Sequence, residues 1–240
     1  MTTAIGFTNS ANSYLTTGSG TTMKSSNCAV CLFAMMSAST GSDQVIWQLE
    51  GALGANVHCL YYDFTTSKTL VYENPSSTVT ITTINMTLGQ WYFIGMVTLD
   101  GYVSMYVKPV GTSTCRMFSA TGSTSSPPTT MWIGNLSTGA KPWLGSICSV
   151  KFWDENNALP FTSGPSLTQE EFERESEQIF PVRTADLRCW FALTNILDFN
   201  SDTNDQRLTL TSGTTAVTQT IGPPIPERRV YSNPPYDIYW

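Results

Sequence analysis

Short apolar runs, separated by Thr, Ser and Gly, recur along the whole chain. Runs of this length that are rich in β-branched and aromatic residues are typical of β-strands. The clearest pair is Gln90–Leu99 and Tyr102–Val107, joined by Asp100-Gly101. Asp-Gly favours a two-residue type I′ turn because both turn positions require positive φ. The pattern therefore predicts a β-hairpin at this place.

The first strand of this hairpin is apolar on both of its alternating faces, which indicates a central strand covered on each side. In the second strand, Val103, Met105 and Val107 form one apolar face. Further strands are predicted at 14–17, 29–38, 44–50, 57–64, 69–72, 78–82, 115–120, 130–134, 145–153, 188–197 and 216–221. The chain is therefore expected to be all-β.

One stretch, residues 166–180, has the character of a helix. Either Ser166 or Thr168 can serve as its N-cap, and Gln169 or Glu171 can complete a capping box. Acidic residues crowd its first turns, where the helix dipole favours negative charge. We interpret its run of charges as a solvated face rather than as a functional site.

The last part of the chain, residues 223–240, is rich in proline and ends in aromatic side chains. Proline has no backbone N–H and cannot pair within a central strand. We therefore divide the chain into a sandwich domain over residues 1–222 and an extended C-terminal arm. Tyr236, Tyr239 and Trp240 are the predicted docking residues of this arm on a partner. The alternative is that the arm folds back over its own sandwich.

Length and charge exclude several classes of protein. A chain of 240 residues fits one sandwich domain. The net charge of −6 argues against a nucleic-acid binder, which needs a basic face to displace counterions from phosphates. No run approaches the roughly 20 apolar residues of a membrane span. The start of the chain lacks the basic and apolar regions of a signal peptide, so we expect synthesis in the cytoplasm without membrane insertion.

The six cysteines are scattered along the chain. Cys28 and Cys31 have the spacing of redox and zinc motifs, but no second pair follows to complete a metal site. On a strand they would face opposite sides about 10 Å apart, beyond the reach of a disulfide. We interpret the cysteines as buried structural thiols, with a redox or metal role as the alternative.

The predicted hairpin, preceded by Leu88-Gly-Gln, resembles the central hairpin of laminin-G-like, concanavalin A-like jelly rolls. Further matches follow in the order of that family, at Met131–Gly134, Trp143–Trp153 and Leu167–Phe172. The resemblance covers about residues 5–220. It implies an antiparallel two-sheet jelly-roll sandwich. One position departs from the family, because Cys148 stands where an acidic residue frequently follows the strand's isoleucine.

No catalytic residue is predicted, and we expect the protein not to be an enzyme. Glycosidases of this fold need two carboxylates, about 5 Å apart when stereochemistry is retained. On one strand this requires acids at i and i+2 or i+4, and no predicted strand carries such a run. His58 and Cys59 are neighbours on a predicted strand, so they point to opposite faces and do not form a base and nucleophile. We interpret His58 as structural.

The most prominent polar cluster is Asp198, Asn200 and Asp202. These hard oxygen ligands have the spacing of a calcium loop. However, the sixth position is Thr203 instead of Gly and the twelfth is Thr209 instead of Glu. A plain turn and a calcium site are both left open, and no other cofactor is predicted.

Aromatic rings on the surface can stack on the apolar faces of sugars. Trp132, Trp143 and Trp153 are candidates, although Trp in a sandwich is more often part of the core. The sequence alone does not assign a carbohydrate-binding residue.

We expect a non-catalytic binding or coat protein, and favour a surface, decoration or attachment component of a virion, for example of a bacteriophage. The fold type serves extracellular recognition, yet no export signal is visible, and lysis releases virion proteins without one. The expected location is the virion or the extracellular space. Expected partners are other virion subunits, copies of the same chain, or surface glycans. The alternatives are a carbohydrate-binding or adhesion module of a secreted cellular protein and, third, a glycoside hydrolase.

Overall fold

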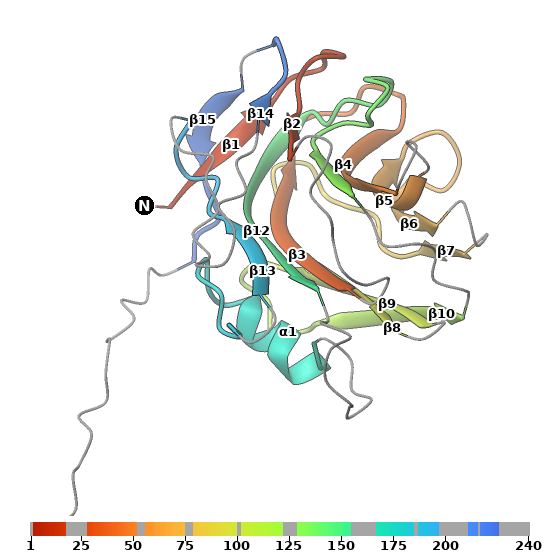
Figure 1. Cartoon of the computed structure of the whole chain (residues 1–240), viewed down its shortest axis with the longest axis vertical. Coiled ribbons are helices and arrows are strands. Elements are labelled where there is room, and N and C mark those ends of the chain that lie inside the picture. Colours follow the sequence, from red (N-terminus) through yellow and green to blue (C-terminus); the bar gives the residue numbers. More distant parts are fainter. Residues whose placement is uncertain are drawn as a thin grey trace, which may run out of the picture.

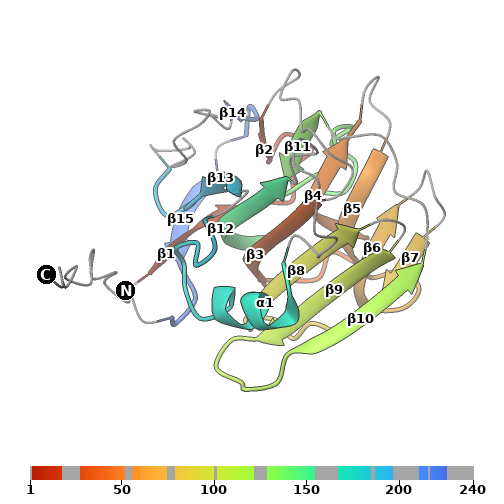
Figure 2. The same ribbon diagram turned by 60° about the horizontal axis from the view of Figure 1, so that its bottom comes forward.

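The structure is a computed structural model. It describes residues 2–17, 28–51, 56–74, 79–99, 102–121, 129–154, 167–184, 187–196, 211–215 and 217–225. These residues form two antiparallel β-sheets that stack on each other, with a short helix against the outer face of the larger sheet (Figures 1 and 2). The predicted all-β, two-sheet jelly-roll sandwich is confirmed.

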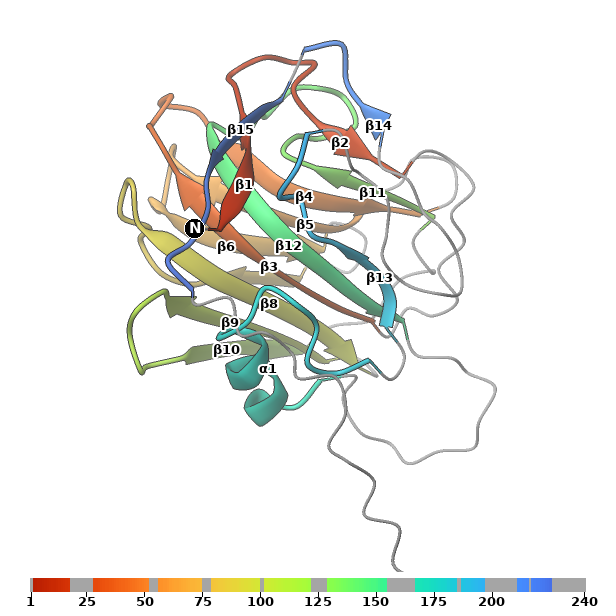
Figure 3. The ribbon, with the colours of Figure 1, turned by 90° about the vertical axis from the view of Figure 1, so that its left-hand side faces the viewer.

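The larger sheet has eight strands. Its path runs in the order β10 (Arg116–Thr121), β9 (Tyr102–Pro109), β8 (Trp91–Leu99), β3 (Cys28–Met36), β12 (Gly145–Asp154), β1 (Thr3–Phe7) and β15 (Thr218–Ile221), and β13 (Leu187–Phe191) also pairs with β12. Figure 3 shows β15, β1 and β12 side by side, which places the start and the end of the sandwich next to each other.

The smaller sheet has seven strands. Their order is β14 (Thr211–Ser212), β2 (Leu15–Thr16), β11 (Thr130–Ile133), β4 (Gln44–Glu50), β5 (Asn56–Asp63), β6 (Thr69–Asn74) and β7 (Val79–Thr82). The chain crosses between the sheets after β1, β2, β3, β7, β10, β11, β13 and β14. These crossings distinguish a jelly roll from a simple meander.

The predicted hairpin is formed by β8 and β9. Leu99 pairs with Tyr102, so two residues connect the strands, and Asp100-Gly101 itself lies outside the described residues. As predicted, β8 is central, because β3 pairs with its other edge. Its side chains alternate between the sheet-to-sheet core and the outer face beneath the helix.

The main core lies between the two sheets. Leu32 and Met96 enter it from the larger sheet, and Trp47 and Leu60 enter it from the smaller one, each at most 1% exposed. Five of the six cysteines are buried and Cys115 is half-buried, and all six thiols are free. Cysteine here behaves as a small apolar residue, which agrees with the interpretation as buried structural thiols.

The helix α1 (Gln169–Glu175) is shorter than the predicted range of 166–180. Its capping box is formed by Thr168 and Glu171, one of the predicted combinations. The predicted range was too long because the chain folds back after Ser176, where contacts with the larger sheet replace helical hydrogen bonds. α1 is the only helix among the described residues, and it is not long and apolar enough to cross a membrane.

A glycine in the sheet determines how closely α1 packs. Gly95 lies on β8 directly beneath Phe172 of the helix, and a Cβ on Gly95 would lie 2.2 Å from Phe172 Cε1. The ring of Phe172 also stacks on Tyr106, with the ring centroids 4.3 Å apart. The helix therefore seals a second, smaller core on the outer face of the larger sheet.

The first residues of the predicted C-terminal arm lie against the sandwich. The Gly222 N–H donates to the Thr2 carbonyl at 2.9 Å, and the Thr2 hydroxyl donates to the Ile225 carbonyl at 3.3 Å. Pro223 is buried and Ile225 is 7% exposed. The remainder of the arm, with the predicted docking residues Tyr236, Tyr239 and Trp240, lies outside the described residues.

Candidate functional site

The predicted calcium ligands Asp198, Asn200 and Asp202 lie outside the described residues. Within the described part of the chain, no three His, Cys, Asp or Glu side chains gather closely enough to hold a metal ion.

Two carboxylates share one hydroxyl on the loop after β5. The Thr65 hydroxyl lies 3.3 Å from Asp43 Oδ1 and 3.0 Å from Asp63 Oδ1. Burial raises the pKa of Asp63, but hydrogen bonds from Thr66, Ser67 and Thr65 outweigh it and hold the pKa well below its ordinary value. Asp43 forms an ion pair with Lys141. A general acid for glycoside cleavage needs a raised pKa, so this pair fits a loop-bracing role better than a catalytic one.

Two further glutamates lie on the outer face of the smaller sheet. Glu50 ends β4, and Glu73 on β6 is in register with Cys59 and, through it, with Gln48 of β4. Adjacent strands are about 4.8 Å apart, so two strand spacings separate β4 from β6 by roughly 10 Å. Glu50 is displaced by two more residues along β4, and its carboxylate binds Trp132 of β11, on the edge of β4 opposite to β6. The two carboxylates therefore point apart and do not form the pair of about 5 Å that a retaining glycosidase needs.

The three tryptophan candidates differ in burial. Trp143 and Trp153 are fully buried, and Trp153 donates its ring N–H to the Arg183 carbonyl at 3.0 Å. Trp132 is partly exposed on the outer face of the smaller sheet. Its Nε1 donates to Glu50 Oε2 at 2.8 Å. Tyr14 meets its ring edge-on, with the centroids 5.0 Å apart.

The position of Trp132 is fixed by its strand. Its neighbours Met131 and Ile133 are fully buried in the core, so alternation turns Trp132 outward. On the same face, Gln48 donates to Glu50 Oε1 at 3.4 Å, and its own Oε1 accepts the Ser137 N–H at 2.9 Å. The result is a ring held by fixed neighbours beside a carboxylate and an amide. We refer to Trp132, Glu50, Gln48 and Tyr14 as the tryptophan face.

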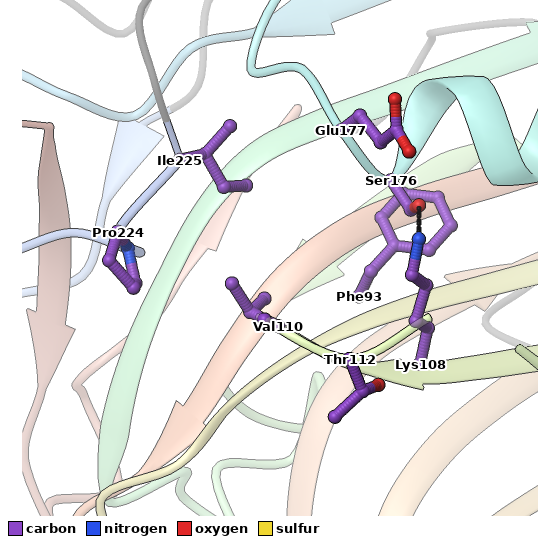
Figure 4. A pocket seen from close by; sticks show the side chains of 9 residues that line it. Phe93, Lys108, Val110, Thr112, Ser176, Glu177, Pro224 and Ile225 are labelled. Atoms are coloured by element: carbon purple, nitrogen blue, oxygen red, sulfur yellow. Dashed lines mark hydrogen bonds between the residues drawn. The ribbon is translucent and has the colours of Figure 1, made fainter. Parts of the chain in front are cut away.

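A pocket of about 340 Å³ opens on the other side of the molecule, and Figure 4 shows its lining. Lys108 at the end of β9, Ser176 after α1 and Ile225 from the C-terminal segment meet there. Lys108 is 9% exposed, and its Nζ donates to the Ser176 hydroxyl at 3.0 Å. Phe93 and Val110 contribute apolar walls. We call this the lysine pocket.

A buried ion pair beneath α1 corrects the interpretation of the helix charges. Glu175 belongs to the run that we assigned to a solvated face, yet Glu175 is fully buried and pairs with Lys151 of β12 at 2.5 Å. Its other oxygen accepts the backbone N–H groups of Val182 and Arg183 at 2.7 and 2.8 Å. The pair fastens the segment after α1 to the sheet, which is a structural role.

His58 and Cys59 point to opposite faces of β5, since they are in register with Leu49 and Gln48, respectively. His58 is buried, and its Nδ1 lies 2.6 Å from the Tyr72 hydroxyl. Burial lowers the pKa of His58 to about 3 and raises the pKa of Cys59 to about 12. Neither group is therefore poised for proton transfer or nucleophilic attack at neutral pH.

The fold is a jelly roll of the concanavalin A-like type. Residues 9–159 match the family described as the concanavalin A-like lectin/glucanases superfamily, in its laminin G group. The chain belongs to this superfamily. A search of the curated proteins found no match.

Solved structures with the same fold include a heptameric SAP-like pentraxin from Limulus polyphemus. It is 19% identical, with a TM-score of 0.53, over 73% of this chain and 82% of the pentraxin chain. Tailspike protein 2 of the Escherichia coli O157:H7 bacteriophage CAB120 is 12% identical, with a TM-score of 0.57 over 79% of this chain. The chain spans 26% of that tailspike. At these identities the likeness shows the fold alone.

Proposed function

We propose that this chain is a non-catalytic glycan-binding module on the surface of a virion, and that the tryptophan face is its binding site. The observation that carries the proposal is the partly exposed ring of Trp132 beside Glu50, in a molecule whose other candidate tryptophans are buried. Sugar-binding sites combine an aromatic ring, which stacks on the apolar face of a sugar, with fixed polar groups that accept or donate hydrogen bonds.

The tryptophan face supplies both parts. The exposed part of the Trp132 ring offers the stacking surface, and Glu50, which is 8% exposed, places a carboxylate acceptor at the N–H edge of the ring. The side chain of Gln48 lies next to it on the same strand. Because these groups hold one another, little side-chain entropy is lost on binding. We expect weak single-site affinity and a gain from several copies, as multivalent lectins show.

A non-catalytic role is supported by the placement of the described carboxylates. Asp43 and Asp63 bind groups of the loop after β5 and Lys141, and Glu175 forms an ion pair with the buried Lys151. Glu50 and Glu73 are not placed as a retaining pair. A glycosidase would need a second carboxylate at the tryptophan face.

The location in a virion is supported by the fold that the chain shares with part of a bacteriophage tailspike. We further propose that the partners are other virion subunits, copies of the same chain, and surface glycans. The second candidate is an adhesion module of a secreted cellular protein, and its support is the fold that the chain also shares with a pentraxin.

A glycan array tests the binding proposal. The wild type should bind a defined set of glycans, and Trp132→Ala should lose about tenfold in affinity. Stacking of a nucleobase on one aromatic ring contributes about 1–3 kcal/mol, and we expect a loss of similar size for a sugar. Tyr102→Ala is the matched control, since Tyr102 is 61% exposed on the other sheet. Equal losses in both variants, or no binding of any glycan, would refute the assignment of the site.

Mass spectrometry of purified particles tests the location. The chain should co-purify with virions in a fixed ratio to the major coat protein. Its recovery from the culture medium without particles would favour the secreted adhesion module. Release of reducing sugar from a bound glycan, lost in Glu50→Gln, would favour the glycoside hydrolase.

A further inference from the structure

The lysine pocket contains a buried cation with unused hydrogen-bonding capacity. Lys108 is 9% exposed, and an ammonium group has three N–H donors. The structure shows one acceptor for them, the Ser176 hydroxyl at 3.0 Å. The described residues place no carboxylate within 4.0 Å of Lys108 Nζ. Among the described residues, the charge of Lys108 therefore has no ion-pair partner of opposite sign.

The second buried lysine among the described residues, Lys151, has different surroundings. Lys151 has a carboxylate from Glu175 and the carbonyls of Gln178 and Phe180 around its ammonium group. A buried charge is costly unless it is paired and hydrogen-bonded. Lys151 is fully satisfied from within the protein, whereas Lys108 is not.

Ser176 does not complete the surroundings of Lys108. Its hydroxyl already donates to the Glu173 carbonyl at 2.6 Å, so it can only accept from the ammonium group. Thr112, which also lines the pocket, donates its hydroxyl to the Pro109 carbonyl at 2.8 Å. Two ammonium protons of Lys108 therefore remain for a further acceptor.

The pocket has the size and composition of a small-ligand site. Its volume of about 340 Å³ lies within the range of about 300–1,000 Å³ that is usual for such sites. Phe93, Val110 and Ile225 contribute apolar surface, and Figure 4 shows Lys108, Ser176 and Phe93 at one side of the pocket and Pro224 and Ile225 at the other. A cavity that combines apolar surface with a convergent charge can orient a ligand by that charge.

We propose that the lysine pocket binds a small organic carboxylic acid with an apolar body. The carboxylate accepts the two free protons of Lys108, and the hydrocarbon part packs against Phe93, Val110 and Ile225. The exposed Glu177, which also lines the pocket, favours a ligand with a single negative charge, because a second anionic group would be repelled by this carboxylate. The site is independent of the tryptophan face and of the proposed glycan binding.

Titration of the full chain with matched probes tests this proposal. Phenylacetate and 4-methylpentanoate are compared with phenylacetamide and 4-methylpentanol, and the backbone amide signals of Gly111 and Thr112 are followed by NMR. The acids should shift these signals saturably with at least tenfold lower Kd than the neutral analogues. Equal shifts from acid and neutral probe, or no saturable shift, would overturn the proposal.

Two variants locate the binding. Lys108→Met keeps the aliphatic stem and should weaken binding of phenylacetate at least tenfold, whereas Lys141→Met should leave it unchanged, because Lys141 is a surface lysine paired with Asp43. Val110→Trp fills the pocket and should abolish binding while the melting temperature confirms folding. Undiminished binding in both Lys108→Met and Val110→Trp would show that the acids bind elsewhere and would refute the site.

Discussion

Lys151 and Glu175 form an ion pair in which both side chains are completely shielded from solvent. Breaking such a pair by removing one charge is strongly destabilising, by about 3–5 kcal/mol, because the other charge stays buried and uncompensated. We therefore expect Glu175→Gln to lower the free energy of unfolding by this amount, measured by urea denaturation. Lys151→Met combined with Glu175→Gln should lose less than the two single variants added together. Strict additivity would show that the pair is not coupled.

His58 should make stability depend on pH. Its folded-state pKa is lowered to about 3 by burial, whereas the unfolded value is about 6.5. Between these values the unfolded chain binds a proton that the folded chain does not, so stability falls as the pH falls from 6.5 to 3. The contribution is at most about 5 kcal/mol, since each pKa unit corresponds to about 1.4 kcal/mol.

His58→Gln removes this titration and keeps a polar group near Tyr72. The difference in unfolding free energy between wild type and variant should shrink as the pH is lowered from 7 to 4, because the variant escapes the acid penalty. Urea curves at four pH values measure it. A difference that stays constant over this range would mean that His58 is not the titrating group.

Gly95→Ala should displace α1. The added Cβ would lie 2.2 Å from Phe172 Cε1, so the helix must lift from the sheet. Overpacking of this kind costs about 1–3 kcal/mol. The same substitution in a Phe172→Leu background should cost less, because the shorter side chain leaves room. Thermal unfolding of the four proteins gives the comparison, and an equal cost in both backgrounds would rule out the clash as the cause.

Ile225 should stabilise the sandwich from outside the predicted domain boundary. It is 7% exposed, and Ile225→Ala should cost about 2 kcal/mol through lost burial and the cavity that remains. Ile221→Ala is the control, since Ile221 is 65% exposed and a surface substitution costs less than about 0.5 kcal/mol. Deleting residues 223–240 removes the Ile225 contact and should lower the melting temperature as well. Similar effects of the two alanine variants would place Ile225 outside the core.

The strands could be predicted from the sequence because alternation and turn residues are local signals. The β8–β9 hairpin follows from Asp100-Gly101 and its flanking runs, and the capping box of α1 follows from Thr168 and Glu171. The end of α1 could not be predicted in this way. Its position depends on Lys151, which recruits Glu175 and two carbonyls from the segment after the helix.

The candidate sites were predicted less completely, because they too depend on contacts between segments that are far apart in the sequence. Trp132 could be selected from the sequence as one of three tryptophans, but its exposure depends on which face of β11 meets the core. Lys108 gave no local signal, because the lysine pocket is assembled from β9, the end of α1 and the segment around Ile225. Contacts between segments so far apart in sequence carry no spacing pattern.

The six cysteines can report which part of the protein unfolds, because burial protects them from chemical labelling. Only the thiolate reacts with alkylating reagents, and Cys115, half-buried before β10, is the cysteine that a reagent reaches in the native state. Cys28, Cys31, Cys148 and Cys189 lie in the larger sheet, and Cys59 lies in the smaller one. Mass analysis of labelled protein therefore distinguishes a molecule that opens one sheet from a molecule that unfolds as a whole, without any engineered probe.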